Sequence, residues 1–480
     1  MQRRTKIICT LGPAVDSADM IRALIRTGMN AARFNFSHGS HDEHLERLNR
    51  LKSVRDSMGW PVAAILDTKG PEIRIRSFGT QSVELKTGET FTLTTRDVVG
   101  DEKRVSVTYS GLHEELYPGQ VILIDDGLVA IRVEEIQATE IVCRVENGGT
   151  LSANKSINIP GAHIRLPALT EKDVEDIRFG VENGFDYIAA SFVRQADDVK
   201  AVRAVLDSFG GQDVRIIAKI ENQEGADNID DILAEADGIM VARGDLGVEV
   251  PASQVPILQK SIIRKCMAAG KPVITATQML DSMIRNPRPT RAEVSDVANA
   301  VYDGTSCIML SGETASGKYP VEALKTMAQI AQDTENSIRY WESLHQDQYR
   351  TVSAVNDAIT HTCCLTAMDL DAKAILTMTS TGHSARMISR YRPACPVVAV
   401  TTRECVRRRL AICWGVIPIL SGEVASTDRI FSLCADVALK ERLAQNGDVV
   451  VIAAGVPLGR AGSTNLIKAH IIDAENLQGY

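Results

Sequence analysis

The sequence lacks the features that would place the protein in a membrane, in a secretory pathway or on nucleic acid. No apolar run approaches the roughly 18 residues of a membrane span. The start, MQRRTKIICTLG, shows no apolar signal-peptide segment, so we expect neither export nor membrane insertion. The formal net charge is −8. This acidic balance argues against nucleic acid or an anionic membrane as a partner, and acidic substrates would need local basic residues.

Cysteine motifs are also missing. The ten cysteines are scattered, with no C-x-x-C pair and no cluster with histidine. Neither a zinc site nor a disulfide framework is therefore expected. The adjacent Cys363 and Cys364 fall in a predicted helix, and we interpret them as core residues rather than a redox pair. A reduced, cytoplasmic protein is the simplest interpretation.

What the sequence does contain is a regular alternation of short apolar strands and helical segments. With 480 residues, 44% of them apolar and 24% charged, the chain has the composition of a globular protein of two or three domains. Eight strand–helix repeats are the content of a TIM (β/α)8 barrel. The predicted strands are Lys6–Thr10, Ala31–Phe36, Val62–Asp67, Tyr187–Ser191, Arg215–Ile220, Gly238–Ala242, Pro272–Ala276 and Ser306–Leu310.

One segment interrupts this repeat and another follows it. After the third strand, short alternating strands with Gly and Pro turns predict a small inserted β-barrel or sandwich on the active-site side. Gly70-Pro71 and Pro167 flank this insert. Because it lies on the active-site side, we expect it to act as a hinged lid that excludes water. Beyond residue 345 the helix–strand alternation restarts as a C-terminal α/β domain. The predicted domains are 1–70 with 168–345 for the barrel, 71–167 for the lid and 346–480 for the C-terminal domain.

The stretch from 215 to 250 contains two neighbouring strands that end in charged residues. Because side chains alternate along a strand, Lys219 and Glu221 share one face. The next strand runs directly into Asp245. Parallel neighbours lie about 4.8 Å apart and end at the same edge, so both carboxylates are close enough to bind one divalent cation. The alternative is a structural Lys–Glu pair with Asp245 in a loop.

The segment RFNFSHG places Arg33, Asn35 and Ser37 on one strand face. An inward arginine at a barrel mouth needs an anionic partner, because burying it alone is costly. Asn35 and Ser37 offer neutral oxygens, and Asp67 with Thr68 on the neighbouring strand adds a carboxylate and a hydroxyl. Such a set suits a monovalent cation or a weakly bound divalent one. The alternative is a rim of polar residues that satisfy one another.

Seven motifs, in order along the chain, carry a resemblance to a known family. RFNFSHG, LDTKGPEIR, KIEN, ARGDLG, ITATQML, RPTRAEVSDVANAV and LSGETASGKYP together closely resemble pyruvate kinase. The resemblance covers nearly the whole chain, including the inserted and C-terminal domains. It implies phosphoryl transfer between phosphoenolpyruvate and ADP, with Mg²⁺ (or Mn²⁺) and K⁺ as cofactors, in a homotetramer. Such chemistry depends on positioning and charge neutralisation, which metals, Lys and Arg supply.

The resemblance also implies roles for residues at the predicted barrel mouth. Lys219 matches the lysine that stabilises charge on the transferring phosphoryl group, and Glu221 with Asp245 match the Mg²⁺ ligands. Arg33 matches the arginine that binds phosphate. Thr277 is a candidate for the route by which a proton reaches the enolate, through water and Ser311 or Glu313. The positions that match contacts to phosphoenolpyruvate are Arg33, Gly244, Asp245 and Thr277.

Two further sites are implied at the same mouth. Potassium-dependent members carry Glu at the position of Glu72, whereas potassium-independent members carry Lys, so we expect potassium dependence. One departure is Ser156, where the family usually has Gly. The positions that match the nucleotide site are Asn35, Ser37, His38, Arg74 and Lys155. The positions that match the potassium site are Asn35, Ser37, Asp67 and Thr68.

A run of hydroxyls lies between a strand and a helix of the predicted C-terminal domain. Hydroxyls, a glycine and helix N-terminal amides can form a phosphate-binding site, although a plain helix N-cap is the alternative. Regulated pyruvate kinases bind a sugar-phosphate effector at the corresponding loop, with a second loop that resembles Gly455–Asn465. The effector would be fructose 1,6-bisphosphate, a sugar monophosphate or a nucleotide. The candidate residues are Thr379, Ser380, Thr381, Gly382, His383, Ser384 and Arg460.

Two other functions remain open at this point. A metal-enolate lyase on a similar barrel would also place Glu and Asp at strand ends, but would not need Lys219 or a nucleotide lid. A non-catalytic regulator would keep only the sugar-phosphate site. The basic run Arg407-Arg408-Arg409 lacks interleaved aromatics, so we interpret it as a solvated or interface helix face rather than a nucleic-acid site.

Overall fold

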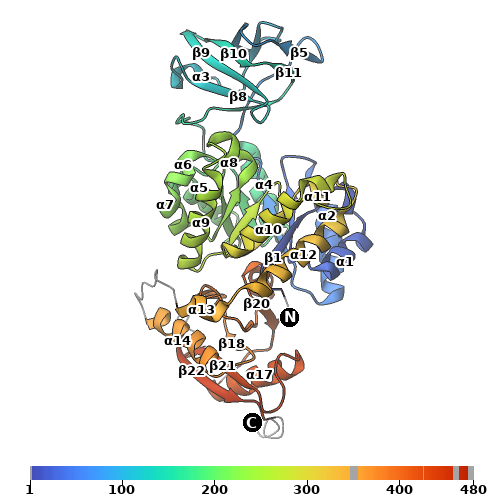
Figure 1. The fold of residues 1–480 in the computed structure, drawn as a ribbon, viewed down its shortest axis with the longest axis vertical. Coiled ribbons are helices and arrows are strands. Elements are labelled where there is room, and N and C mark those ends of the chain that lie inside the picture. The colour runs from blue at the N-terminus through green and yellow to red at the C-terminus, as the bar shows by residue number, and fades with distance from the viewer. Residues whose placement is uncertain (1–2, 346–354, 425, 458–463, 474–480) are drawn as a thin grey trace.

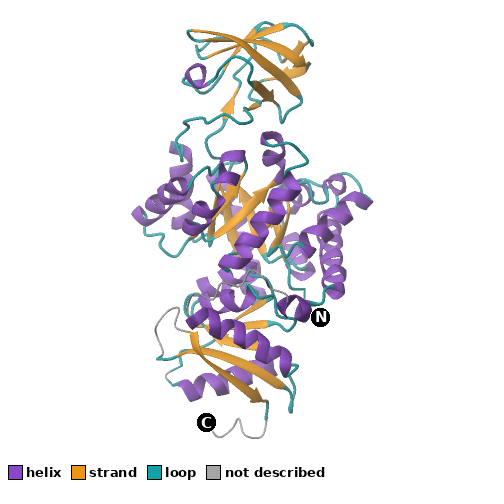
Figure 2. Cartoon of the chain, turned by 60° about the vertical axis from the view of Figure 1, so that its left-hand side comes forward, coloured by secondary structure: helices purple, strands orange, loops and turns teal. Residues whose placement is uncertain are grey.

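The computed structural model describes residues 3–345, 355–424, 426–457 and 464–473. They form three units along one long axis, with the barrel in the middle, the inserted strands at one end and the C-terminal unit at the other (Figure 1). Figure 2 shows the central strands surrounded by helices, whereas the inserted unit consists almost entirely of strands. Among the described residues, no helix is both long and apolar enough to cross a lipid bilayer.

Eight parallel strands close the central barrel, in the order β1-β17-β16-β15-β14-β13-β3-β2. Nearly all of their residues are buried on both faces, as expected for parallel strands covered by helices. The predicted TIM barrel is confirmed, and each predicted strand agrees to within one residue at either end. The strands are β1 (Lys6–Thr10), β2 (Ala31–Asn35), β3 (Ala63–Asp67), β13 (Tyr187–Ala190), β14 (Arg215–Ile220), β15 (Gly238–Ala242), β16 (Val273–Ala276) and β17 (Cys307–Leu310).

Alternate side chains of these strands fill two separate cores. Ile65 and Ile217 belong to the cluster inside the barrel, whereas Phe34 packs outward beneath the helices. Two short helices meet at Asn228, which ends the first and precedes the second. The helices around the barrel are η1 (Pro13–Val15), α1 (Ala18–Thr27), α2 (His41–Met58), α4 (Glu171–Glu182), α5 (Ala196–Ser208), α6 (Gln223–Asp227), α7 (Ile229–Glu235), α8 (Arg243–Glu249), α9 (Val255–Ala269), η2 (Asp281–Ile284), α10 (Arg291–Tyr302), α11 (Gly312–Ala315) and α12 (Pro320–Ser337).

The inserted unit is a curved sheet around its own apolar core. Seven strands pair in the order β4-β12-β8-β9-β10-β6-β7, and β11 pairs with β5. A bridge between Ile75 and Val107 joins the two ends of the larger sheet, which gives it the barrel-like closure that was predicted. The elements are β4 (Ile73–Arg74), β5 (Ser82–Leu85), β6 (Thr90–Thr94), β7 (Arg104–Ser106), α3 (Leu112–Glu115), β8 (Val121–Ile124), β9 (Val129–Gln137), β10 (Glu140–Asn147), β11 (Gly149–Ser152) and β12 (Ser156–Asn158).

The C-terminal unit is a five-stranded sheet in the order β20-β19-β18-β21-β22, parallel except for the antiparallel edge strand β22. Cys363 and Cys364 lie in its core, and all ten cysteines of the chain are free. The elements are α13 (Tyr340–His345), α14 (Val355–Asp369), β18 (Ile375–Met378), α15 (His383–Ser389), β19 (Val397–Thr401), α16 (Glu404–Arg409), η3 (Leu410–Ile412), β20 (Val416–Leu420), α17 (Thr427–Lys440), β21 (Val449–Gly455) and β22 (Thr464–Ile471). The predicted domain limits remain predictions.

The C-terminal unit closes the N-terminal end of the barrel. Ile412 packs into the cluster inside the barrel, and the hydroxyl of Tyr187 donates to the main-chain oxygen of Arg409 at 2.8 Å. Arg408 pairs with the buried carboxylate of Asp186 at 2.9 Å. The basic run therefore lies in a domain interface, and its alternative interpretation as a solvated face is wrong. The opposite end of the barrel, where the strands finish, is left for the inserted unit.

Candidate active site

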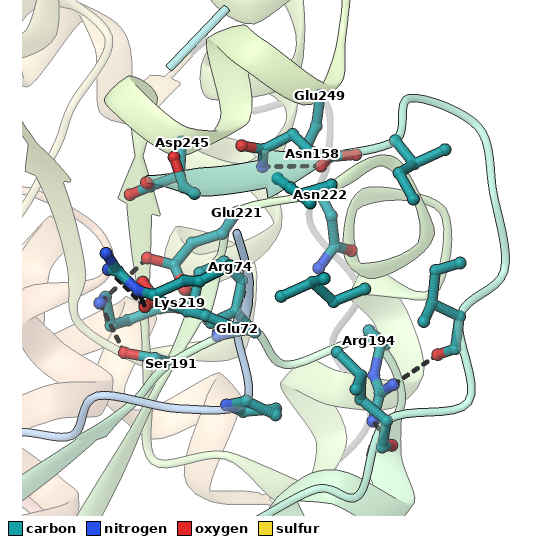
Figure 3. Close-up of a pocket in the computed structure, with 18 of the residues that line it drawn as sticks. Glu72, Arg74, Asn158, Ser191, Arg194, Lys219, Glu221, Asn222, Asp245 and Glu249 are labelled. Carbon is teal, nitrogen blue, oxygen red and sulfur yellow. Dashed lines mark hydrogen bonds and ion pairs between the residues drawn. The ribbon is translucent and has the colours of Figure 1, made fainter. Parts of the chain in front are cut away.

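A cleft of about 870 Å³ lies between the C-terminal ends of the barrel strands and the inserted unit. Barrel residues form one wall and residues of β4, β12 and their loops form the other (Figure 3). Most of the residues singled out in the sequence meet here. The predicted site residues that line the cleft are Arg33, Asn35, Ser37, His38, Arg74, Lys155, Lys219, Glu221 and Asp245.

Lys219, on β14, is the centre of this arrangement. Its Nζ lies 3.0 Å from Asp67 Oδ1, 3.0 Å from Glu221 Oε1 and 2.7 Å from Ser191 Oγ. An ammonium group has three hydrogens, so each has one acceptor. Burial alone would lower the pKa of Lys219, but Asp67 and Glu221 outweigh it and raise that pKa above its usual value. The amine therefore stays cationic at neutral pH.

Arg33 and Lys219 share the carboxylate of Asp67. Arg33 Nε donates to Asp67 Oδ2 at 2.6 Å, and its Nη1 donates to Thr10 Oγ1 at 3.2 Å. Burial opposes ionisation of Asp67, yet the two cations outweigh burial and keep the pKa of Asp67 below its usual value. The anionic partner that we predicted for Arg33 is thus Asp67, on the neighbouring strand β3.

Glu221 and Asp245 form the carboxylate pair of the cleft. Burial and the Asp245 carboxylate raise the pKa of Glu221 to about 7, although Lys219 opposes that shift. Burial also raises the pKa of Asp245. Two partly desolvated carboxylates destabilise each other as anions, and a divalent cation between them would relieve this repulsion.

The charge balance and the donor set both fit a magnesium ion. With Asp67, the cluster has one more carboxylate than cations, so a divalent ion would leave it positive toward an anionic substrate. Among the residues that the structure describes, no group of three or more His, Cys, Asp or Glu side chains is arranged for a metal. Mg²⁺ characteristically takes one or two protein carboxylates and completes its shell with water and substrate oxygens.

The four residues matched to a potassium site lie on adjoining strand ends. Asn35 is directly opposite Asp67 in the register of β2 and β3. The Oδ1 of Asn35 accepts from the main-chain nitrogen of Ser37 at 3.2 Å. Thr68 Oγ1 accepts from the main-chain nitrogen of Ser191 at 3.2 Å. The two adjoining strand ends therefore carry one ionised and three neutral oxygen-bearing side chains, a set of the kind that a weakly bound monovalent cation accepts.

Basic residues of the inserted unit face this cluster from across the cleft. Arg74 pairs with Glu72 at 2.6 Å and donates to the main-chain oxygen of Asn154 at 2.6 Å. Lys155 pairs with Asp125 at 2.9 Å. Both side chains line the cleft, so an anionic nucleotide could exchange places with these carboxylates.

Thr277 sits in a strained turn after β16. Its φ of +70° is rare for a β-branched residue. Its Oγ1 accepts from the main-chain nitrogen of Gly244 at 2.7 Å and donates to the preceding carbonyl oxygen at 2.6 Å. Thr277 and Gly244 are therefore held together as the resemblance implied, although neither lines the cleft. The Thr277 hydroxyl is therefore hydrogen-bonded both as acceptor and as donor. Its role in proton transfer stays a prediction.

Sequence reasoning missed the supports of this site. Arg243 donates to the main-chain oxygen of Thr277 at 2.8 Å and pairs with Asp296 at 2.7 Å, so it holds the strained turn. In the sequence, Ser191 is only the last residue of a predicted strand. The main-chain nitrogen of Phe192 donates to Glu221 at 2.6 Å. Only the inward register of Ser191 was visible in the sequence; the other contacts join residues far apart in the chain.

The predicted effector loop occupies the turn between β18 and α15. Gly382, at φ +82°, donates its main-chain N–H to Thr379 Oγ1 at 2.9 Å. Ser384 Oγ lies 2.5 Å from Thr464 Oγ1, so the first loop lies next to the end of the second. Arg460 lies outside the described residues. The residues of the first loop are Thr379, Ser380, Thr381, Gly382, His383 and Ser384.

The fold and the cleft define a TIM-barrel enzyme with an inserted β domain over its active-site end. Comparison with known proteins identifies the family to which this enzyme belongs. A family profile described as pyruvate kinase, barrel domain, matches residues 2–324, and one described as pyruvate kinase, alpha/beta domain, matches residues 357–470. The chain belongs to the pyruvate kinase family. That membership decides between the two enzyme classes left open above, in favour of the kinase and against the lyase.

Individual relatives agree over nearly the full length. The pyruvate kinase of Clostridium acetobutylicum is 51% identical over 472 residues, which cover 98% of this chain and 100% of that protein. That of Geobacillus stearothermophilus is also 51% identical, over 98% of this chain and 81% of its own length. The crystal structure of a pyruvate kinase from Cryptosporidium parvum superimposes with a TM-score of 0.93 at 40% identity and covers 98% of this chain.

The raised pKa of Glu221 predicts how metal binding depends on pH. Below pH 7 this carboxyl carries a proton in the free protein, and a cation must displace it. We expect the affinity for Mn²⁺, measured by electron paramagnetic resonance without substrates, to fall up to about tenfold per pH unit below about 7 and to level off above it. Glu221→Gln should abolish tight binding. Glu249→Gln, which removes a half-buried carboxylate of the same cleft, is the control. Equal affinity at pH 5.5 and 7.5 would contradict this assignment.

Proposed function

We propose that the cleft transfers the phosphoryl group of phosphoenolpyruvate to ADP, giving pyruvate and ATP in glycolysis, with Mg²⁺ and K⁺ as cofactors. The observation that carries this proposal is the ammonium of Lys219, held at the cleft wall between Asp67, Glu221 and Ser191. Phosphoryl transfer needs charge neutralisation and positioning more than covalent catalysis. A fixed cation beside a carboxylate pair supplies both.

The chain's own residues would divide the work as follows. Arg33 and Lys219 would bind the oxygens of the phosphoryl group, because both cations line the cleft while Asp67 holds them in place. The turn that carries Gly244 and Asp245, held in place by Thr277, matches the family's contacts to the carboxylate end of the substrate and would orient it. Mg²⁺ held by Glu221 and Asp245 would act as a Lewis acid toward the enolate oxygen.

The inserted domain would supply the nucleotide side. Arg74 and Lys155 face the barrel wall of Asn35, Ser37 and His38 across one cleft, and these are the residues matched to nucleotide contacts. A lid that closes over both substrates excludes water, which would otherwise compete as phosphoryl acceptor. We further propose the domain limits given above and a cytoplasmic homotetramer, on the family's pattern.

A potassium ion would complete the site beside Asp67. The four oxygen donors of Asn35, Ser37, Asp67 and Thr68 support this, as does Glu72 at the position where potassium-independent members carry Lys.

We also propose allosteric activation through the loop of residues 379–384, by a sugar phosphate or a nucleotide. The loop hydroxyls, the left-handed Gly382 and the neighbouring Thr464 support a phosphate site. Arg386, which sequence reasoning did not include, donates to the main-chain oxygen of Thr381 at 3.4 Å and brings a positive charge to the same turn.

Removing the amine of Lys219 tests the reaction and its central residue together. Pyruvate formation from phosphoenolpyruvate and ADP should fall on the order of 10²-fold or more in Lys219→Met, because a charge aimed at the reacting phosphoryl is lost. Lys200→Met, which removes an exposed lysine, is the control. A thermal melt of each variant separates lost chemistry from lost folding. Full turnover in Lys219→Met would refute the assignment.

The potassium requirement is tested at Glu72. Wild-type turnover should fall about tenfold or more when K⁺ is replaced by tetramethylammonium, because a fixed charge near the phosphoryl group is lost. Glu72→Lys should keep most of its turnover without K⁺, since the new ammonium is tethered near the same place. Glu72→Gln also removes the partner of Arg74 but adds no cation, so it should stay potassium-dependent. Full activity of the wild type without K⁺ contradicts the proposal.

Allosteric control is tested by the shape of the phosphoenolpyruvate saturation curve. A sigmoidal curve should become hyperbolic with the activating sugar phosphate or nucleotide, since ligand binding favours one of two states. Ser384→Ala should lose the response and keep basal turnover, whereas Ser380→Ala, at a neighbouring exposed hydroxyl, should lose less. A curve that no sugar phosphate or nucleotide changes would rule this out.

A further inference from the structure

Residues Ser191 to Arg194, between β13 and α5, form a segment that we call the 191–194 loop. Its first residue touches the catalytic lysine: Ser191 Oγ accepts from Lys219 Nζ at 2.7 Å and donates to the main-chain oxygen of Thr68 at 2.6 Å. Its second residue touches the metal-binding carboxylate: the main-chain nitrogen of Phe192 donates to Glu221 at 2.6 Å. In Figure 3, Ser191 lies beside Lys219, joined to it by a dashed line, and Arg194 lies toward the right of the view.

The same loop supports the entrance of the inserted domain. Gly70, at φ +72°, is the last residue before the predicted limit of the lid. A Cβ on Gly70 would lie 2.7 Å from Ser191 Cβ and 2.9 Å from the Phe192 ring, so the entrance backbone rests directly on the loop. The main-chain nitrogen of Gly70 donates to the buried Asp173 at 2.9 Å, which fastens the entrance to α4.

The loop also binds the returning segment of the inserted domain. Arg194 donates from Nη1 to the main-chain oxygen of Ile164 at 2.8 Å and from Nη2 to that of Leu166 at 2.7 Å. Asp198, in the first turn of α5, pairs with the same guanidinium. Four consecutive residues therefore contact both connections of the lid and both groups at the centre of the site.

The backbone of this loop is held in an unfavourable conformation. Phe192 has a φ of +55°, which is uncommon for a residue with a bulky side chain. Such strain persists only where the surroundings over-determine it, and it gathers at functional sites. Here the surroundings are Gly70 on one side and Glu221 on the other.

We propose that the 191–194 loop is the positioning element through which the lid sets the direction of the Lys219 ammonium and the Glu221 carboxylate. Ser191 is its positioning residue: of the three acceptors of Lys219 it is the neutral one, and its own hydrogen is committed to Thr68. It therefore fixes the amine without neutralising it. A displacement of the backbone at Gly70 would move Ser191 and Phe192, and through them the Lys219 ammonium and the Glu221 carboxylate. This inference rests on the proposed roles of Lys219 and Glu221.

The test is a pair of glycine substitutions with a double mutant. Gly70→Ala pushes on Ser191, whereas Gly59→Ala, at a nearly equal φ of +68° with nothing within 4 Å of its Cβ, carries the same backbone strain without the contact. We expect kcat to fall about tenfold or more in Gly70→Ala and in Ser191→Ala, since small misplacements of reacting groups are costly. Gly59→Ala should stay within about twofold of the wild type.

The double mutant separates positioning from general damage. With kcat measured at saturating Mn²⁺, so that weaker metal binding through Glu221 does not contribute, Gly70→Ala/Ser191→Ala should lose little more kcat than Ser191→Ala alone, because coupled residues are not additive. Gly70→Ala should also weaken Mn²⁺ binding, because it displaces Phe192 and thus Glu221, whereas Ser191→Ala should leave that affinity within about twofold. Losses in kcat that multiply, or a Gly70→Ala that behaves like Gly59→Ala, would overturn the proposal.

Two further measurements keep the result interpretable. If Gly70→Ala does not fold, Arg194→Met disturbs the loop from its other end, and the same less-than-additive loss with Ser191→Ala is expected. Lys219→Met tests the underlying function separately. Loss of turnover in Lys219→Met with an unaffected Ser191→Ala refutes only the positioning role, whereas full turnover in Lys219→Met refutes the proposed site itself.

Discussion

Lys219 and Arg33 share the buried carboxylate of Asp67, and Lys219 also faces Glu221. Charged groups at this depth are stable only as a set, because removal of one partner leaves another uncompensated. Much of the surrounding architecture serves this set. Strand alternation points the side chains inward, the register of β2 and β3 places Arg33 and Asp67 on neighbouring strands, and the parallel barrel brings β14 to the same mouth. Counted with Asp245, the excess of carboxylate over cations in this set supports the divalent cation proposed above.

The three units of the fold contribute differently to that mouth. The C-terminal domain closes the opposite end of the barrel, where Ile412 enters the inner core and Arg408 neutralises Asp186. The open end is therefore free for substrates. The inserted domain brings basic residues over it, and its two connections meet on the 191–194 loop. The groups at the strand ends and both connections of the inserted domain thus contact one short segment of backbone.

Much of the barrel and of its active-site end was predictable from the pattern of apolar and polar residues along the sequence. The barrel strands agree to within a residue, since apolar runs of this length between helical segments have few other interpretations. The side-chain directions of Lys219, Glu221 and Arg33 followed from strand alternation alone. Their partners did not: Ser191, Arg243 and the amide of Phe192 reach the site through contacts between distant segments. The basic run at Arg408 had two interpretations by sequence, and only packing against Asp186 decided between them.

The sequence by itself determined the family, the barrel, the inserted strands and the identity of the groups at the cleft, because periodicity, motif order and residue chemistry are written locally. Tertiary structure alone decided how those groups are held. It assigned three acceptors to one ammonium, bound the hydroxyl of Thr277 into a backbone turn and placed Gly70 against Ser191. These are distances between residues far apart in the chain, and they depend on how whole elements pack, which no single segment encodes.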